Sequence, residues 1–230
     1  MSFQAKDVMK AASTTLQDGG AIRWTPPELL EYLNAGMREI VTRKPNAVSE
    51  TRELTLVQGT KQELPADCTI LADVTYNTVA PKTAIRALAN RTLMDAQIPG
   101  WQDTDTLPFN KTVRHVIHSM NDPRSFHVVP GNDGTGKIEA VVGVMPAPVA
   151  APAGAAALDI DAYTNTVPMQ DVWRNALENF VLYRAFSKDA GLPGAGERAA
   201  AHFQMFTTII EGVANGEAAM ALANQAKMPA

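Results

Sequence analysis

Apolar residues recur with a helical period at both ends of the chain, whereas the middle alternates between apolar and polar positions. Near the N-terminus, one apolar face predicts a short helix that stops at Gly19-Gly20. A second helix follows after a short loop, so the two helices are expected to pack as an antiparallel hairpin. The residues that mark the first apolar face are Phe3, Val8, Met9, Ala12 and Leu16.

The start of the second helix, in RWTPPELLEYLNAGMREIV (residues 23–41), is specified almost residue by residue. Thr25 suits the N-cap, Pro26 suits the first helical position, and Glu28 completes a T-x-x-E capping box. Trp24 is expected to pack on Leu29 as a hydrophobic staple, so Trp24, Thr25 and Glu28 are the candidate residues for fixing the helix entry. The expected core-facing residues are Leu29, Leu30, Leu33, Met37, Ile40 and Val41.

The middle of the chain, from about residue 50 to 145, loses the helical period and predicts mainly strands. Alternation in residues 50–65 predicts a hairpin that turns at Gly59-Thr60, with Leu54 and Leu56 on one side. Three later runs predict an antiparallel meander, and one segment between them has the spacing of a short helix. The runs of the meander are residues 112–119, 125–129 and 137–144, and the helical segment is residues 84–95.

The C-terminal part returns to a helical period after the uncharged, proline-containing segment PAPVAAPAGAAA, residues 146–157. This segment is typical of a semi-extended linker or a mobile surface loop. One helix is expected from about Val172 to the stop signals at Gly191 and Pro193, and another over residues 197–225. Gly212 and Gly216 predict a kink or break in the last helix.

The order of these elements predicts an α+β fold. The N- and C-terminal helices, residues 1–46 and 158–230, are expected to pack as an antiparallel helical bundle. Residues 47–145 are expected to form an inserted antiparallel β-rich domain, followed by the Ala/Pro linker at 146–157.

The amino-acid composition and charge argue against several classes of function. The 24 acidic and 20 basic residues give a formal charge of -4 without a basic stripe, which argues against a nucleic-acid reader. No apolar run approaches the roughly 20 residues of a membrane span, and the N-terminus has no secretory signal, so a soluble protein of intracellular origin without a membrane partner is expected. Cys68, the single cysteine, excludes an intrachain disulfide and is expected to be buried.

One stretch matches a nucleotide-binding pattern. Residues Gly131 to Lys137 satisfy G-x-x-x-x-G-K, the spacing of a loop that cradles phosphate. Such a loop needs Ser or Thr after the lysine and a helix that starts there, whereas Ile138 follows and the next residues predict a strand. A β-turn is therefore the favoured interpretation, and a nucleotide-binding enzyme is kept as an alternative.

Two further groups resemble metal sites only in part. The positions of His115 and His118 differ by three, an odd number, so in a strand they face opposite sides, and His127 alone on the next strand does not complete a site. Asp159 and Asp161 resemble the start of a calcium loop that lacks its third ligand and its glycine. No metal, cofactor or catalytic residue is therefore assigned.

Five segments together carry a family likeness. From about residue 5 to 210 the chain resembles the head-to-tail adaptor (connector) proteins of tailed bacteriophages. The matching motifs, in order, are R-W-T-x-x-E-L-L-x-Y-L-N-x-G-x-R-E-I, G-T-x-Q-x-L-P, D-P-R-x-F-x-V-x-P, L-x-x-F-V-L-Y-R-A-x-S-K-D-A and A-A-x-H-F-Q.

The resemblance implies a non-enzymatic virion component without cofactors, assembled in the host cytoplasm. Such adaptors form a homo-oligomeric ring, usually twelve-fold, beneath the portal protein and join it to tail or nozzle proteins. DNA passes through the lumen during genome ejection without specific binding. Helices are expected near the ring axis, with the β module facing outward or toward the tail. The alternative structural role is another tail-completion or tail-tube ring component.

The resemblance also implies that the C-terminal segment docks on the portal. Arg38, Arg184 and Lys188 match motif positions, but the family likeness carries no catalytic role for them. The residues expected to bind the portal are Gly216, Met220, Leu222, Asn224, Gln225, Lys227 and Met228.

Overall fold

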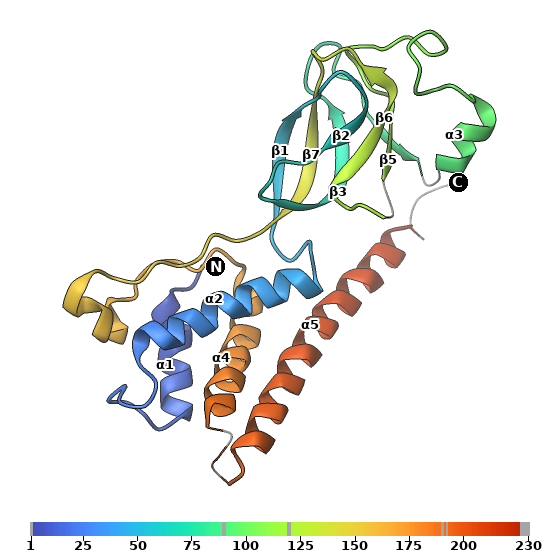
Figure 1. Ribbon diagram of the computed structural model, residues 1–230. Helices are drawn as coiled ribbons and strands as arrows, with labels where there is room; N and C mark the ends of the chain where they lie inside the picture. Colours follow the sequence, from blue (N-terminus) through green and yellow to red (C-terminus); the bar gives the residue numbers. More distant parts are fainter. Residues whose placement is uncertain (1, 89–90, 119–120, 190, 192, 226–230) are drawn as a thin grey trace. The chain divides into compact units, whose positions relative to one another are not determined.

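A computed structural model describes residues 2–88, 91–118, 121–189, 191 and 193–225, and its elements have the α+β composition that the sequence predicts (Figure 1). The chain forms two compact units. The helical unit comprises Met1–Lys44 and Pro146–Ala230, and the β unit comprises Pro45–Met145. Helices therefore lie at both termini, and each unit is described by itself below.

In the helical unit, α1, α2 and α4 pack against one another, and α5 runs back along α4 (Figure 1). Figure 1 shows α2 lying across α1 and α4, so the predicted antiparallel hairpin of the first two helices is wrong. The helices are α1 (Ala5–Thr15), α2 (Pro26–Arg43), α4 (Arg174–Lys188) and α5 (Ala195–Gln225), and the 3₁₀ turns are η1 (Gly154–Leu158), η2 (Ile160–Ala162) and η3 (Asp171–Trp173).

The apolar stripe of α2 is buried at all six positions that the sequence singles out, with Leu30 the most exposed at 5%. This burial is the main source of stability for a helix of this length, because isolated helices are marginal in water. Gly36 lies where α2 meets α4. A Cβ atom there would stand 3.0 Å from Phe180 Cδ1 and 3.1 Å from Leu177 Cδ2, so glycine allows the two helices to approach closely.

The segment predicted as a linker, residues 146–157, is held against α2. Asn34 Nδ2 donates to the Val149 carbonyl at 3.0 Å, and the Val149 N–H donates to Asn34 Oδ1 at 2.8 Å. The Val149 side chain is buried. This pair of hydrogen bonds satisfies the backbone N–H and carbonyl of Val149, which belongs to no strand.

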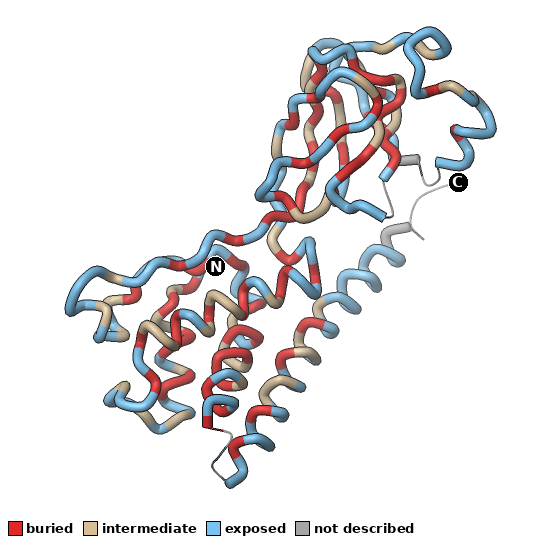
Figure 2. Tube along the Cα trace, viewed as in Figure 1, coloured by how far each residue is buried: buried red, intermediate tan, exposed pale blue. Residues whose placement is uncertain are grey.

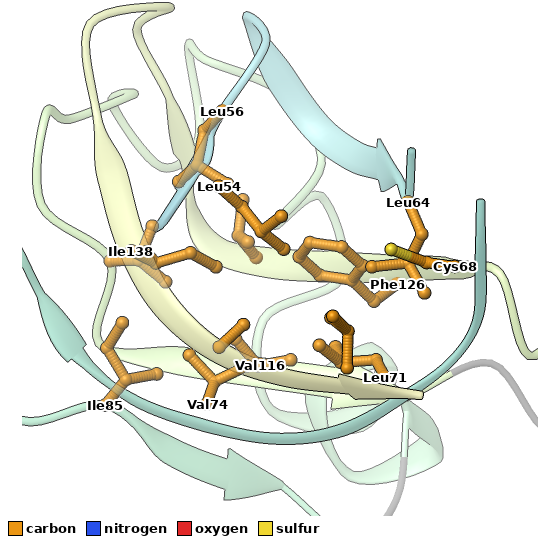
Figure 3. Packing of buried hydrophobic residues seen from close by; sticks show 14 of the residues in the cluster. Leu54, Leu56, Leu64, Cys68, Leu71, Val74, Ile85, Val116, Phe126 and Ile138 are labelled. Carbon is orange, nitrogen blue, oxygen red and sulfur yellow. The ribbon is translucent and has the colours of Figure 1, made fainter. Parts of the chain in front are cut away.

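The β unit contains two sheets that pack face to face over a shared core (Figure 3). One sheet has the strand order β1-β7-β3, and the other has the order β2-β6-β5-β4. Figure 3 shows Leu54, Ile138, Phe126 and Val116 pointing toward one another from the two sheets. The elements are β1 (Ser49–Thr55), β2 (Gly59–Glu63), β3 (Cys68–Asn77), β4 (Arg86–Leu88), α3 (Arg91–Gln97), β5 (His115–His118), β6 (Ser125–Asn132) and β7 (Lys137–Val144).

The strand pairing differs from the prediction. The predicted hairpin over residues 50–65 is wrong, because β1 pairs with β7 and β2 pairs with β6. The predicted meander holds only for β5 and β6, since β7 lies between β1 and β3 in the other sheet. Leu54 and Leu56 are nevertheless buried on one side, as expected. The chain passes from one sheet to the other between β1 and β2, and both side chains lie in the shared core.

Two further elements of the β unit were not foreseen. Residues 84–95, predicted as one helix, instead form β4 and the first part of α3, and β4 pairs with β5 in parallel. Strand β3 was missed altogether. Cys68, at its start, is buried as expected, with a relative exposure of 2%.

The four-stranded sheet is covered on both faces. Its outer face carries a second apolar cluster formed by Met94, Trp101, Ile117 and Val129. Trp101 Nε1 donates to Asp95 Oδ1 at 2.8 Å, which fixes the indole over this face. Strand β6 is therefore buried at six of its eight positions, unlike the alternating pattern of a half-exposed strand.

Candidate assembly surface

The entry of α2 is formed by the residues that the sequence predicts but not through the predicted hydrogen bonds. Thr25 is the N-cap residue, with φ -66° and ψ 151°, and Pro26 takes the first helical position. The Thr25 side chain makes no capping hydrogen bond, so the predicted capping box is wrong. Glu28 instead accepts from Tyr32 Oη at 2.7 Å and from Lys188 Nζ at 2.8 Å.

Lys188 links the end of α4 to the start of α2. Its ammonium donates to Glu28 Oε2 and also to the Arg23 carbonyl at 3.0 Å. Burial acts to raise the pKa of Glu28, but the hydrogen bonds from Lys188 and Tyr32 outweigh it and hold the pKa below its usual value. Burial and the Glu28 hydrogen bond raise the pKa of Tyr32. The carboxylate is therefore kept ionised as a tie between the two helices.

The residues before the cap are tied to α4 as well. Trp24 is 7% exposed, and its Nε1 donates to the Ala185 carbonyl at 3.2 Å. Arg23 Nε and Nη2 both donate to Asp189 Oδ1, at 3.0 and 2.6 Å. The entry of α2 is thus fixed by contacts with Ala185, Lys188 and the C-cap residue Asp189 at the end of α4, rather than by a side-chain cap.

The loop between α1 and α2 is organised by Asp18, which the sequence reasoning did not single out. Its carboxylate accepts from the N–H groups of Ile22, Arg23 and Trp24 at 3.0, 2.9 and 2.9 Å. The hydrogen bond from the Trp24 N–H is the leading cause that lowers the pKa of Asp18. The Asp-Gly-Gly stretch is an ordinary turn signal, so the sequence shows a turn here but not its bonding.

Aromatic side chains hold the first half of α5 on α4. The Phe180 and Phe206 rings lie 5.0 Å apart, and the Tyr183 and Phe203 rings lie 4.8 Å apart. The Arg43 guanidinium lies 5.3 Å from the centre of the Phe203 ring, which adds a cation–π contact from the end of α2. The aromatic stripe predicted for the C-terminal helices is therefore used for packing.

The second half of α5 is exposed. Figure 2 shows buried positions along the first half of α5 and exposed positions toward its end. Among the described side chains, Ile210 is the last buried one, and Met220 and Leu222 are 65% and 67% exposed. Lys44 Nζ lies 2.6 Å from Glu217 Oε2, which ties this half to the end of α2.

The helix continues through Gly212 and Gly216, so the predicted break is wrong. An α-helix of 31 residues tolerates two glycines when no neighbouring side chain forces a bend, and no atom lies within 4 Å of a Cβ built at either position. Of the residues expected to bind the portal, Asn224 and Gln225 fall in the last turn of α5, whereas Lys227 and Met228 lie outside the described residues.

The Gly131–Lys137 stretch comprises the end of β6, a turn over residues 133–136 and the first residue of β7. Asn132 Oδ1 accepts from the N–H groups of Gly134 and Gly136 at 2.9 and 3.1 Å, so these two groups do not face a phosphate. Lys137 begins a strand, and its Nζ lies 2.8 Å from Glu53 Oε1. The geometry favours the β-turn over the nucleotide loop.

The candidate metal residues are not brought together. Within the described ranges, no group of three or more His, Cys, Asp or Glu side chains could hold a metal ion. His127 packs against Trp101 at 5.8 Å, and Asp161 forms an ion pair with Lys10. Across the same residues, none of the helices combines the length and apolar character that crossing a membrane requires.

The helical unit therefore has a packed core, a helix entry fixed by side chains and a last helix whose second half is exposed. The family model described as SU10 adaptor protein matches residues 3–227, so the chain belongs to the SU10 adaptor protein family. The resemblance to phage head-to-tail adaptors is thereby confirmed, and the chain is a phage adaptor protein and virion component. A search among curated proteins found none that matches the chain.

Proposed function

We propose that the protein assembles as a homo-oligomeric ring at the junction of phage head and tail, beneath the portal, with twelve copies as the expected number. The ring joins the portal to the tail or nozzle proteins and leaves a channel for DNA during genome ejection. Family membership supports the adaptor role. The formal charge of -4 is consistent with a channel wall that does not grip phosphate.

The exposed half of α5 is the proposed portal-docking element. It extends 15 residues beyond Ile210, which is about 22 Å at the helical rise. Met220 and Leu222 present apolar side chains on this half without an apolar core to cover them. These two side chains lie about 200° apart around the helix, so the partner site has to contact two sides of it. A helix that continues past its own core with exposed apolar residues is suited to insertion into such a site, and this observation carries the proposal.

Mixing the purified protein with purified portal rings tests the function directly. Electron microscopy is expected to show an added layer of density on one face of the portal ring. A persistent failure to add this layer would overturn the adaptor role beneath the portal. A layer found only on isolated tails would instead indicate a tail-completion component.

Two variants of α5 separate docking from packing. Met220→Ser combined with Leu222→Ser is expected to weaken portal binding at least about tenfold, because about 1.4 kcal/mol of apolar contact is removed. Met205→Ser is the matched control, since Met205 is 53% exposed on the first half of the same helix. Equal loss of binding in both variants would contradict docking by the second half.

A further inference from the structure

A cavity of about 390 Å³ opens on the outer face of the four-stranded sheet in the β unit. Val116 and Val128 point into the sandwich core, whereas Ile117 and Val129 lie on the opposite face with Met94. The cavity lies on this second face, under α3 and the segment that follows it. Its volume falls in the range of pockets that bind ligands or side chains.

The wall of the cavity combines apolar and polar groups without an acidic residue. Arg114 is the positively charged residue of the wall, and Asn110 Oδ1 is already used by the N–H and hydroxyl of Thr112. Such a wall favours an apolar group that carries a negative charge. The apolar side chains of the wall are Met94, Ile98, Leu107, Pro108, Val129 and Pro130.

His115 has an unused hydrogen-bonding group. Its Nδ1 is buried and has no hydrogen-bond partner, and it is the one side-chain nitrogen or oxygen in this condition among the described residues. Buried polar atoms are almost always paired, because an unpaired one has lost its water without compensation. Because Nδ1 has almost no accessible surface, a group bound in the cavity contacts other atoms of the His115 ring, and the signals of that ring report on occupancy of the cavity.

The charge of Arg114 is the second feature of the cavity wall. Arg114 is exposed and forms no ion pair in the described part of the chain, whereas Arg52 and Arg91 of the same unit pair with carboxylates. Arg86, in β4, donates its N–H at 3.0 Å to the carbonyl of Arg114, the residue before β5, and is likewise exposed and without an ion pair there. Positive charge therefore accumulates along this edge of the sheet.

We propose that the cavity binds a peptide segment of a protein partner in which a carboxylate side chain adjoins an apolar one. The apolar side chain packs on Met94, Ile98 and Leu107, and the carboxylate pairs with Arg114, beside the His115 ring. This site lies on a different unit from the portal-docking helix and does not depend on it.

A peptide fits this surface better than nucleic acid does. The cavity is enclosed enough to take one or two side chains, and a duplex backbone needs an extended basic stripe instead. Residues 45–145 contain nine Lys and Arg against eleven Asp and Glu, so the unit as a whole does not attract DNA. The wall of the cavity differs from the unit as a whole, because it contains Arg114 and no acidic residue.

The test uses the full chain with ¹³C-labelled histidine and two blocked dipeptides, N-acetyl-Phe-Asp-amide and its neutral counterpart N-acetyl-Phe-Asn-amide. The aspartyl probe, titrated to about 10 mM, is expected to shift the His115 ring signals in a saturable way. The asparaginyl probe is expected to bind at least about fivefold more weakly, because it lacks the charge. Absence of a saturable shift, or equal binding of both probes, would overturn the proposal.

Two arginine variants locate the charge contact. Arg114→Gln is expected to weaken binding of the aspartyl probe at least about fivefold. Arg86→Gln is the control, because it alters the neighbouring exposed arginine outside the cavity wall. It is expected to change this binding less than about twofold. Both positions are exposed, so both variants are expected to fold. Equal effects of the two variants, or a short DNA duplex that binds more tightly than the peptide, would contradict a peptide carboxylate in this cavity.

Discussion

The two halves of α5 belong to one continuous helix but depend on different interactions. In the first half, Phe206 is fully buried and Ile210 is 5% exposed, so packing against α4 stabilises the helix. In the second half, from Glu211 to Ala223, no described side chain is buried. Its helical structure depends on alanine-rich sequence and on the Lys44–Glu217 ion pair. Exposed residues of the second half are therefore available to bind a partner, whereas those of the first half are held by packing in the core.

The largest expected effect is at Phe206, in the first half of α5. Phe206→Ala is expected to lower the free energy of unfolding by about 3–5 kcal/mol, because it opens a cavity beside Phe180. Urea denaturation measures the change. Met205→Ala, at the exposed neighbouring position, serves as the control and is expected to stay within about 0.5 kcal/mol. A loss below about 1 kcal/mol at Phe206 would remove the distinction between the two halves.

The loop before α2 offers a second test, because its exposed backbone is held by a side chain rather than by helix propensity. Asp18→Asn is expected to lower the free energy of unfolding by about 1 kcal/mol at pH 7, since the carboxylate that accepts three N–H groups is partly solvated.

The pH dependence of this loss shows whether the charge of Asp18 is its cause. The folded-state pKa of Asp18 is lowered, so its stabilisation is present above the ordinary value of about 3.9 and is lost as the pH falls further. Wild type and variant are therefore expected to converge below about pH 4. Denaturation curves at several pH values measure this, and a constant difference down to pH 3 would show that the charge has no part in the effect.

A smaller effect is expected from strengthening the second half of α5. Gly212→Ala is expected to stabilise it by about 0.5–1 kcal/mol, because alanine is the better helix former and the new methyl group meets no atom within 4 Å. Amide hydrogen exchange of residues 213–220 is expected to slow by about two- to fivefold. Unchanged exchange would mean that this half is not helical in the free protein.

The smallest effect on stability is expected at Met220. Met220→Ser is expected to change the free energy of unfolding by less than about 0.5 kcal/mol, because the side chain is 65% exposed. Thermal or urea denaturation of the free protein measures it. A loss above about 1 kcal/mol would place Met220 in the core and would contradict its assignment to a docking surface.

The helical parts of the fold could be predicted closely because their signals are local. The stripe of α2, the proline at its first turn and the stop signals of α4 all lie within a few residues of the structure they specify. Cys68 was likewise placed correctly in the core. The pairing of the strands could not be predicted in this way, because β1 pairs with β7 across more than 80 residues and no local pattern specifies that partner.

Strand β3 shows why one element escaped prediction. Its fully buried positions are Cys68, Leu71, Val74 and Asn77, a spacing of three rather than two. Register shifts against β7 after Cys68, Leu71 and Val74 cause this spacing, because each bulge turns the next side chains to a different face. The alternation that identifies a strand in a sequence is therefore absent.

The sequence by itself determined the fold class, the positions of α1, α2, α4 and α5 and the likeness to phage adaptors, because periodicity and motifs are carried by neighbouring residues. Only the tertiary structure decided which side chains meet. The contact between Glu28 and Lys188, 160 residues apart in the sequence, replaces the local capping box. Arg23 likewise binds Asp189, 166 residues further along the chain. The cavity at His115 likewise exists only where α3 covers the sheet. Contacts of this kind depend on the packing of distant elements, which no short stretch of sequence encodes.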